Sequence, residues 1–195
     1  MLPLFGEYER RRSLPSDIVD HLPELYHWAR GWPFAHIAEL GTGGASRGPG
    51  GSGNSTSALL AGVEVTGRGH VWSFDIEPPD VPDAFRESEH WTFTLADALR
   101  EKALAEAPAE LDVLFVDLDP HSFEQTLTAL TLWVPRVRRG GVVLLHDTEY
   151  GTPAAAFYDP HESAVGKALD VYCAMKDLAW ENRPGCHGLG VLRIR

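Results

Sequence analysis

Short apolar segments recur along this chain of 195 residues, and several of them end in an acidic side chain. Segment 111–117 is largely apolar and ends at Asp117, and segment 141–147 ends in His146 and Asp147. Strands that are buried on both faces of a parallel sheet have this nearly continuous apolar composition. Their carboxyl ends open onto the ligand crevice of an α/β sheet. The three polar side chains are therefore predicted to lie side by side, where two carboxylates and an imidazole can bind a divalent cation.

Three more apolar segments precede these two, and segments with helical patterns separate them. This alternation predicts an α/β fold built on a parallel sheet. The last two predicted strands are joined by only six residues, 183–188, which is too short for a parallel crossover, so this pair must be antiparallel. The predicted strands are 36–40, 70–74, 91–95, 111–117, 141–146, 178–182 and 189–194, and the predicted helices begin near residues 54, 98, 122 and 163.

The N-terminal part of the chain gives weaker signals. Residues 1–15 are predicted to be irregular, and a helix is expected from Ser16 to Gly31, with Pro23 able to kink or split it. The length fits one domain over residues 1–195. We expect residues 1–35 to form an N-terminal helical cap and residues 36–195 to form the core.

Charge and cysteine content narrow the classes of partner. The formal net charge is −11, whereas nucleic acids and anionic membranes reward a basic surface, so neither is expected as a partner. Cys173 and Cys186 form no metal-binding pair and are expected to be reduced thiols of a cytoplasmic protein. The start of the chain lacks the apolar core of a signal peptide. The sequence does not determine the oligomeric state, and a homo-oligomer is one of the alternatives left open.

A glycine-rich loop follows the first predicted strand, with seven glycines in residues 41–53 before the next helix. Such a loop lets a ligand approach the backbone closely. Asp75 ends the second strand, about 20 residues after the loop, where a carboxylate can bind the hydroxyls of a ribose. Asp97 follows the third strand and can reach an adenine. Glu39 would repel a dinucleotide pyrophosphate and attract the ammonium group of S-adenosylmethionine. The alternative is that these acids only cap helices or face solvent.

Several motifs together resemble one family. They are Glu39-Leu40-Gly41 with Gly53-Asn54-Ser55-Thr56, then Asp75, the stretch 111–117, the stretch 140–148, and the terminal segment 180–190. As a set they resemble the class I S-adenosylmethionine-dependent methyltransferases, in particular the small-molecule O-methyltransferases labelled cephalosporin-hydroxylase-like or macrocin-O-methyltransferase-like. The resemblance covers about residues 16–195. It implies a doubly wound, Rossmann-like sheet of seven strands in the order 3-2-1-4-5-7-6, with strand 7 antiparallel.

The resemblance also implies roles at the cofactor end. Glu39 and the turn at Gly41 would hold the methionine end of S-adenosylmethionine, Asp75 the ribose and Asp97 the adenine. One departure is the spacing of Gly41 and Gly53, which are twelve residues apart where the family usually has about four between its anchoring glycines. The insertion 44–52 is predicted to act as a flap. The remaining predicted cofactor-binding residues are Thr42, Asn54, Ser55, Thr56 and Asp117.

At the catalytic end, metal-dependent members of this superfamily hold a divalent ion at the ends of strands 4 and 5. The matching positions are Asp117, His146 and Asp147, and these ligands suit Mg²⁺ or Mn²⁺. His121 matches the family's histidine at the start of the next helix and is the expected general base, because histidine accepts protons near neutral pH. Asp119 could replace Asp117 as a ligand. The alternative is that these residues are helix caps and turn residues.

The sequence thus predicts an S-adenosylmethionine-dependent methyltransferase that transfers a methyl group to a hydroxyl of a small molecule, such as a sugar or secondary metabolite. Its predicted catalytic residues are His121 and Asp117, with metal assistance. One alternative is a nicotinamide-dependent Rossmann oxidoreductase, which Glu39 and the terminal hairpin disfavour. Two others are a cofactor-binding protein that acts through a partner without catalysis, and a hydroxylase, for which no separate redox-iron ligand set is found.

Overall fold

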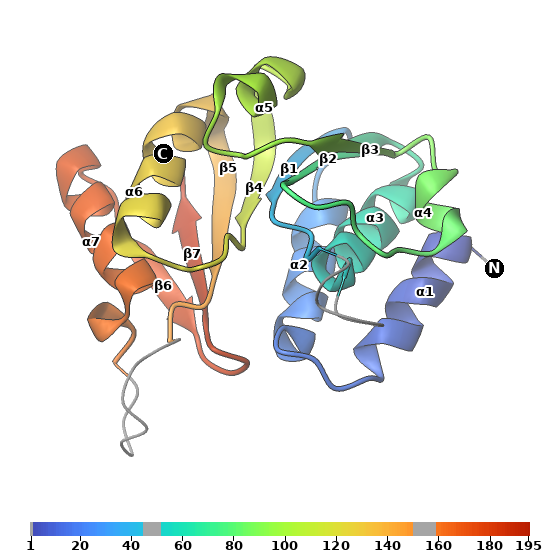
Figure 1. Cartoon of the computed structure of the whole chain (residues 1–195), viewed down its shortest axis with the longest axis horizontal. Helices are drawn as coiled ribbons and strands as arrows, with labels where there is room; N and C mark the ends of the chain where they lie inside the picture. The colour runs from blue at the N-terminus through green and yellow to red at the C-terminus, as the bar shows by residue number, and fades with distance from the viewer. Residues whose placement is uncertain (1, 45–51, 150–158) are drawn as a thin grey trace.

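The computed structural model describes residues 2–44, 52–149 and 159–195 (Figure 1). Within these residues, seven strands form one sheet in the order β3-β2-β1-β4-β5-β7-β6. Strands β1 to β5 pair in parallel, and β7 runs antiparallel to both β5 and β6. The predicted fold class and strand order are confirmed. The strands are β1 (Ala35–Leu40), β2 (Gly69–Asp75), β3 (Trp91–Leu95), β4 (Leu111–Val116), β5 (Val137–His146), β6 (Trp180–Arg183) and β7 (Leu189–Arg193).

Helices cover both faces of the sheet because the central strands are apolar on both faces (Figure 1). Val113 faces one hydrophobic cluster together with helices α1 to α4, and Leu114, its neighbour, faces the other together with α5 to α7. This alternation is the two-residue period of a strand. The helices are α1 (Pro3–Arg12), α2 (Leu22–Arg30), α3 (Asn54–Thr66), α4 (Asp83–Arg86), α5 (Glu101–Glu106), α6 (Phe123–Trp133) and α7 (Ala164–Lys176).

Local signals explain where the longer helices begin and end. Ser122 and Ser163 precede α6 and α7, and each side chain accepts a hydrogen bond from a backbone N–H three residues later. Helix α3 lies between Gly53 and Gly67, both in the left-handed conformation that glycine adopts without strain. These signals place the start of α3 directly after the glycine-rich loop and the start of α6 directly after β4.

The N-terminal expectations are corrected. Residues 3–12 form helix α1, where an irregular segment was predicted, because the carboxylate of Glu64 on α3 accepts hydrogen bonds from the backbone N–H groups of Leu4 and Phe5 at 3.3 and 2.9 Å. This cap lies some 60 residues away in sequence. The helix expected from Ser16 begins only at Leu22, after a short 3₁₀ turn, because Pro23 has no N–H and fits only the first turn.

The flap predicted for residues 44–52 falls mostly on residues 45–51, which lie outside the described residues. Among the described residues, no helix is both long enough and apolar enough to cross a bilayer.

Candidate functional site

A cavity of about 260 Å³ lies at the carboxyl ends of β1 to β4. It brings together the turn at Gly41, Asp75 at the end of β2, Asp97 after β3, and Asp117 after β4. These are four of the residues predicted to bind a cofactor, and they come from four separate strand ends. The other lining residues are Gly43, Gly44, Phe74, Ile76, Glu77, Ala98, Leu99, Leu118, Asp119 and Gln125.

The Gly41 turn fits against its neighbours through the backbone. Gly41 has a φ of +89°, and a Cβ atom at this position would overlap the carbonyl oxygen of Asp117. Its N–H donates to the carbonyl of Phe74 at 2.9 Å. The next residue, Thr42, donates from its backbone N–H and its hydroxyl to Asp75 Oδ2 at 2.8 and 3.1 Å. The loop after β1 is therefore fixed to the ends of both neighbouring strands.

Asp97 is half-buried and is held by its own loop. Its Oδ1 accepts from the backbone N–H of Leu99 at 2.9 Å, and its Oδ2 accepts from Arg100 at 3.2 Å. Because its side chain is 42 % exposed and lines the cavity, it can hold the loop and still face a ligand. The capping interpretation and the ligand interpretation are thus compatible at this position.

Glu39 lies behind the cavity wall and is fully buried. Its carboxylate accepts hydrogen bonds from Ser55, Thr56 and Ser73 at 2.6, 2.8 and 2.5 Å. Burial disfavours the charged form more than the three hydroxyls favour it, so the pKa of Glu39 rises to about 7. Glu39 joins β1, β2 and the start of α3, and it is not among the residues that line the cavity. Its predicted contact with the methionine end stays a prediction.

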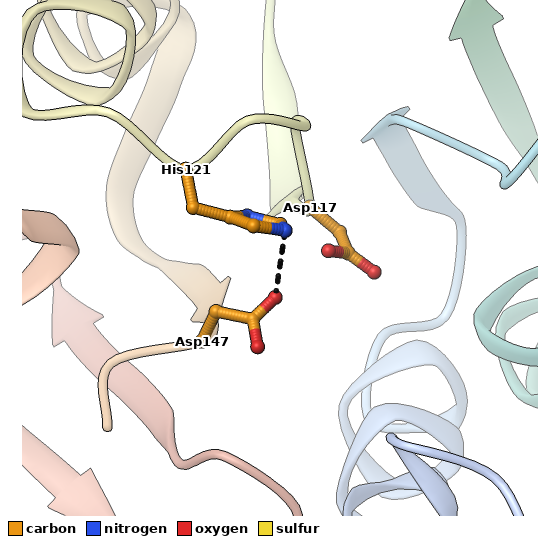
Figure 2. A group of neighbouring side chains, drawn as sticks. All are labelled: Asp117, His121 and Asp147. Carbon is orange, nitrogen blue, oxygen red and sulfur yellow. Dashed lines mark ion pairs between the residues drawn. The ribbon is translucent and has the colours of Figure 1, made fainter. Parts of the chain in front are cut away.

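Three side chains converge beside the cavity: Asp117 after β4, His121 before α6 and Asp147 after β5 (Figure 2). Each offers a ligand atom, and these atoms all lie within 4.8 Å of one another. His121 Nε2 lies 3.2 Å from Asp147 Oδ2. Two carboxylate oxygens and an imidazole nitrogen are donors that bind divalent cations.

His146 lies behind this group and is almost fully buried. Its Nε2 donates to the carbonyls of Asp17 and Cys186 at 3.1 and 2.9 Å, and it must carry a proton because carbonyls only accept. Its Nδ1 lies 3.5 Å from Asp117 and 3.1 Å from Asp147, although neither carboxylate is aligned for a hydrogen bond. Burial alone would lower the pKa of His146, but the two carboxylates outweigh it and raise the pKa to about 11.

The predicted metal ligands were Asp117, His146 and Asp147, and the structure brings all three together. It also brings His121 to the front of the two aspartates, which makes this residue a second candidate for the imidazole ligand. The raised pKa of His146 favours its charged form beside the two aspartates, and its role as a metal ligand stays a prediction.

His187, which the sequence analysis does not single out, lies in the turn between β6 and β7. Its Nδ1 lies 3.2 Å from Asp147 Oδ1, so three histidines surround one buried aspartate. The antiparallel pairing of His146 with Leu189 brings this turn back to the end of β5. His187 could have been identified only from the register of β7 against β5, and the sequence alone does not determine this register.

Backbone strain gathers at the same place. Five non-glycine residues in the described parts of the chain have positive φ, and four of them are Asp147 itself or residues near it. Such conformations are costly for residues with a Cβ and are often kept at functional sites. The four residues are His121 (φ 55°), Asp147 (φ 64°), Cys186 (φ 40°) and His187 (φ 68°).

Solved structures resemble this fold over nearly the whole chain. The SAH-bound Podospora anserina methyltransferase PaMTH1 is 18% identical, with a TM-score of 0.63 over 100% of this chain and 89% of that one. The O-methyltransferase NovP is 19% identical, with a TM-score of 0.59 over 91% and 81% of the two chains. MycE, from mycinamycin biosynthesis, was solved with Mg, SAH and mycinamycin VI, and is 16% identical, with a TM-score of 0.63 over 98% of this chain and 54% of its own. At these identities, the likeness establishes the fold.

No curated protein has a sequence that matches this chain significantly. Residues 50–148, just over half of the chain, match the family described as "Methyltransferase domain". This match includes the end of the glycine-rich loop, the acids after β2, β3 and β4, and the His146-Asp147 pair. The chain therefore belongs to the methyltransferase-domain family.

Proposed function

We propose that this methyltransferase uses S-adenosylmethionine to methylate a hydroxyl group of a small molecule, with help from a divalent metal ion. The observation that carries this proposal is the position of Asp117. It lines the cavity that contains Asp75 and Asp97, and it also belongs to the cluster with His121 and Asp147. A donor bound in the cavity and an acceptor at the cluster would thus meet at one residue.

The cavity has the donors and acceptors that an adenosyl group needs. Asp75 is suited to the ribose hydroxyls and Asp97 to the adenine, while Ile76 and Leu99 offer apolar surface for the base. Gly41 and Gly43 have positive φ and leave the backbone open for close approach. S-adenosylmethionine would supply a methyl group bound to a sulfonium, whose carbon–sulfur bond breaks as the acceptor oxygen attacks, so that the sulfur leaves as the neutral thioether of S-adenosylhomocysteine. The SAH found in PaMTH1 and MycE supports this choice of cofactor.

The cluster has the donors that a hard divalent cation needs. Asp117 and Asp147 would hold the ion, with an imidazole from His121 or His146, and Mg²⁺ or Mn²⁺ fits this set. When bound, such an ion lowers the pKa of an acceptor hydroxyl and positions its oxygen. MycE, which was solved with Mg, supports the presence of a metal.

His121 is proposed as the general base that takes the acceptor proton. Asp147 would orient the imidazole through the 3.2 Å contact at Nε2. Mn²⁺ binding separates the role of base from the role of ligand. If His121 is the base, His121→Ala lowers turnover by about 10² to 10⁴-fold and leaves Mn²⁺ affinity unchanged. If His121 is a ligand, Mn²⁺ affinity falls as well.

The expected acceptor is a small molecule, such as a sugar or a secondary metabolite. NovP, described as an O-methyltransferase, and MycE, solved with mycinamycin VI, support a small-molecule hydroxyl. Nucleic acid and membrane are not expected as partners, and a homo-oligomer stays open. Cys173 and Cys186 are free thiols, which fits a cytoplasmic enzyme.

Calorimetry tests the cofactor. We expect S-adenosylhomocysteine to bind and NAD to show no binding. Tight binding of NAD would favour the nicotinamide-dependent oxidoreductase and reject this proposal. Binding of S-adenosylhomocysteine without methyl transfer to any hydroxyl compound in a broad panel would favour a non-catalytic cofactor-binding protein.

Asp147→Asn tests the metal. Asparagine tolerates the left-handed backbone at this position, so the variant removes the charge without adding strain. We expect Mn²⁺ affinity to fall by at least about 100-fold, since changes to residues behind the ligands already cause 10- to 100-fold losses. Affinity for S-adenosylhomocysteine should stay within a few-fold. Methyl transfer that persists in EDTA, with unchanged Mn²⁺ binding by the variant, would reject metal assistance.

A further inference from the structure

A second, smaller cavity adjoins the one proposed for the adenosyl group. Its volume of about 20 Å³ is enough for one group the size of a water molecule. Gly43 and Asp117 line both cavities, so a ligand in the large one can extend a single small group into the small one. The other residues that line the small cavity are Asp17, Ile18, Thr42, Asn54 and Ser55.

The small cavity favours a cation. Among the described residues, two carboxylates, Asp17 and Asp117, belong to its wall, and no basic side chain does. Asp17 and Ile18 come from the segment before α2, far in sequence from the other lining residues. The wall also includes Asn54 and Ser55 of the first turn of α3, where the positive end of the helix dipole favours a negative group beside the cation.

Contacts of the main chain hold Asp17 at this position. His146 Nε2 donates to the Asp17 carbonyl at 3.1 Å, and Cys186 Sγ lies 3.7 Å from the Ser16 carbonyl. The next side chain, Ile18, is buried in the core. The backbone is therefore anchored on both sides of Asp17 while its side chain lines the cavity.

We propose that Asp17 binds the α-ammonium group of the cofactor's amino-acid end. The inference rests on the proposed use of S-adenosylmethionine, which carries a single primary ammonium at the end opposite the adenine. Glu39 was the sequence-based candidate for this contact, but its carboxylate is enclosed by three hydroxyls behind the wall. The N-terminal segment thus contributes directly to cofactor binding.

Two ligands and two variants test this role by calorimetry. S-adenosylhomocysteine carries the ammonium, and 5′-methylthioadenosine has the same nucleoside and thioether without the amino acid. Asp17→Asn should weaken the binding of S-adenosylhomocysteine by about 10-fold or more, as expected for a lost charge-assisted hydrogen bond. It should leave the affinity for 5′-methylthioadenosine unchanged. Asp20→Asn is the matched control, because Asp20 is an exposed acid of the same segment that lines neither cavity. It should change neither affinity.

Each other outcome has a definite meaning. Equal weakening of both ligands by Asp17→Asn would overturn the proposal, because it would show that the residue only supports the fold of the segment. Unchanged binding of both ligands would overturn it too. If the unmodified protein binds neither ligand, the proposed cofactor itself is wrong, and this failure is distinct from the other two.

Discussion

The two ends of the site are built in different ways. At the cofactor end, the acids are held by loops at the strand ends: Asp97 accepts from the N–H of Leu99, and Asp75 accepts from those of Thr42 and Glu77. At the catalytic end, Asp147 is surrounded by three histidines from separate parts of the chain. One end depends on local backbone geometry and the other on contacts between distant segments.

This difference has an energetic counterpart. The loop at the cofactor end uses glycine where φ is positive, so its backbone is relaxed. The catalytic end places aspartate, cysteine and histidine in the same conformation, which is unfavourable for each of them. The strained residues therefore lower the free energy of unfolding in the part of the chain around the aspartates. The comparison predicts that the cofactor end is sensitive to backbone changes and that the catalytic end contains stability that substitution can recover.

The largest expected effect is at Gly41. Gly41→Ala should lower the free energy of unfolding by about 4 kcal/mol or more, because the new Cβ is forced onto the backbone carbonyl of Asp117 in a left-handed conformation. Gly67→Ala is the matched control, since Gly67 also has positive φ but open space around it, and it should cost only about 1 kcal/mol. Urea unfolding of both variants measures the difference. Equal losses would show that the turn at Gly41 can shift, and would remove the contrast between the two ends.

The sheet could be predicted because its evidence is local. The apolar stretch 111–116 and the acids at the strand ends are each visible within a few residues, and the family resemblance supplied the strand order. The antiparallel final pair followed from the short connection 183–188. That Gly41, Asp75, Asp97 and Asp117 would meet was predictable for the same reason, since a parallel sheet brings its strand ends to one edge, and their role in cofactor binding stays a prediction.

What the sequence did not reveal depends on contacts between distant residues. Helix α1 is capped by Glu64 on α3, and its first turn lacks a local cap. The contact of His187 with Asp147 depends on the register of β7 against β5. Asp17 reaches the small cavity because His146 binds its carbonyl. None of these contacts leaves a pattern in the local sequence.

The second prediction concerns Glu39, which joins β1, β2 and α3 behind the cofactor cavity. A carboxyl group whose pKa rises from 4.5 to about 7 on folding is protonated in the native state over a range where the unfolded chain is ionised. The raised pKa therefore lowers the free energy of unfolding. This loss of stability is absent below pH 4.5, grows as the pH rises to 7, and reaches about 3 kcal/mol above pH 7. Glu39→Gln removes it, so the stability of the variant relative to wild type should rise over this range.

Urea unfolding of both proteins at pH 5, 6, 7 and 8 measures this difference. Glutamine can keep hydrogen bonds to the three hydroxyls, because a hydroxyl both donates and accepts. Ionisation elsewhere, including that of His146, cancels in the comparison of variant with wild type. A difference that does not vary with pH would mean that Glu39 is ionised in the folded protein, and that the cofactor end contains a buried charge as the catalytic end does.

The third prediction tests whether a change at the cofactor end affects cofactor binding alone and leaves the metal cluster unchanged. Asp75→Ala should weaken the binding free energy of S-adenosylhomocysteine by about 1.5 to 3 kcal/mol, because the ribose loses a charge-assisted hydrogen bond. Asp80→Ala is the control, since this exposed acid lies on the same connection outside the cavity. Calorimetry measures both. If Asp75→Ala also releases the Thr42 loop, Mn²⁺ affinity at the cluster will fall with it, which would show that the two ends are coupled.

The smallest expected effect is at His187. This residue has a φ of 68°, and its contact with Asp147 is half-exposed, so relief of strain should outweigh loss of the contact. We expect His187→Gly to raise the free energy of unfolding by about 1 kcal/mol, whereas His187→Ala, which keeps the strain and loses the imidazole, should lower it by less than about 1 kcal/mol. Urea unfolding of the pair measures both effects. If glycine destabilises the protein as alanine does, the contact with Asp147 is stronger than its exposure implies, and the catalytic end is held together by the strained residues themselves.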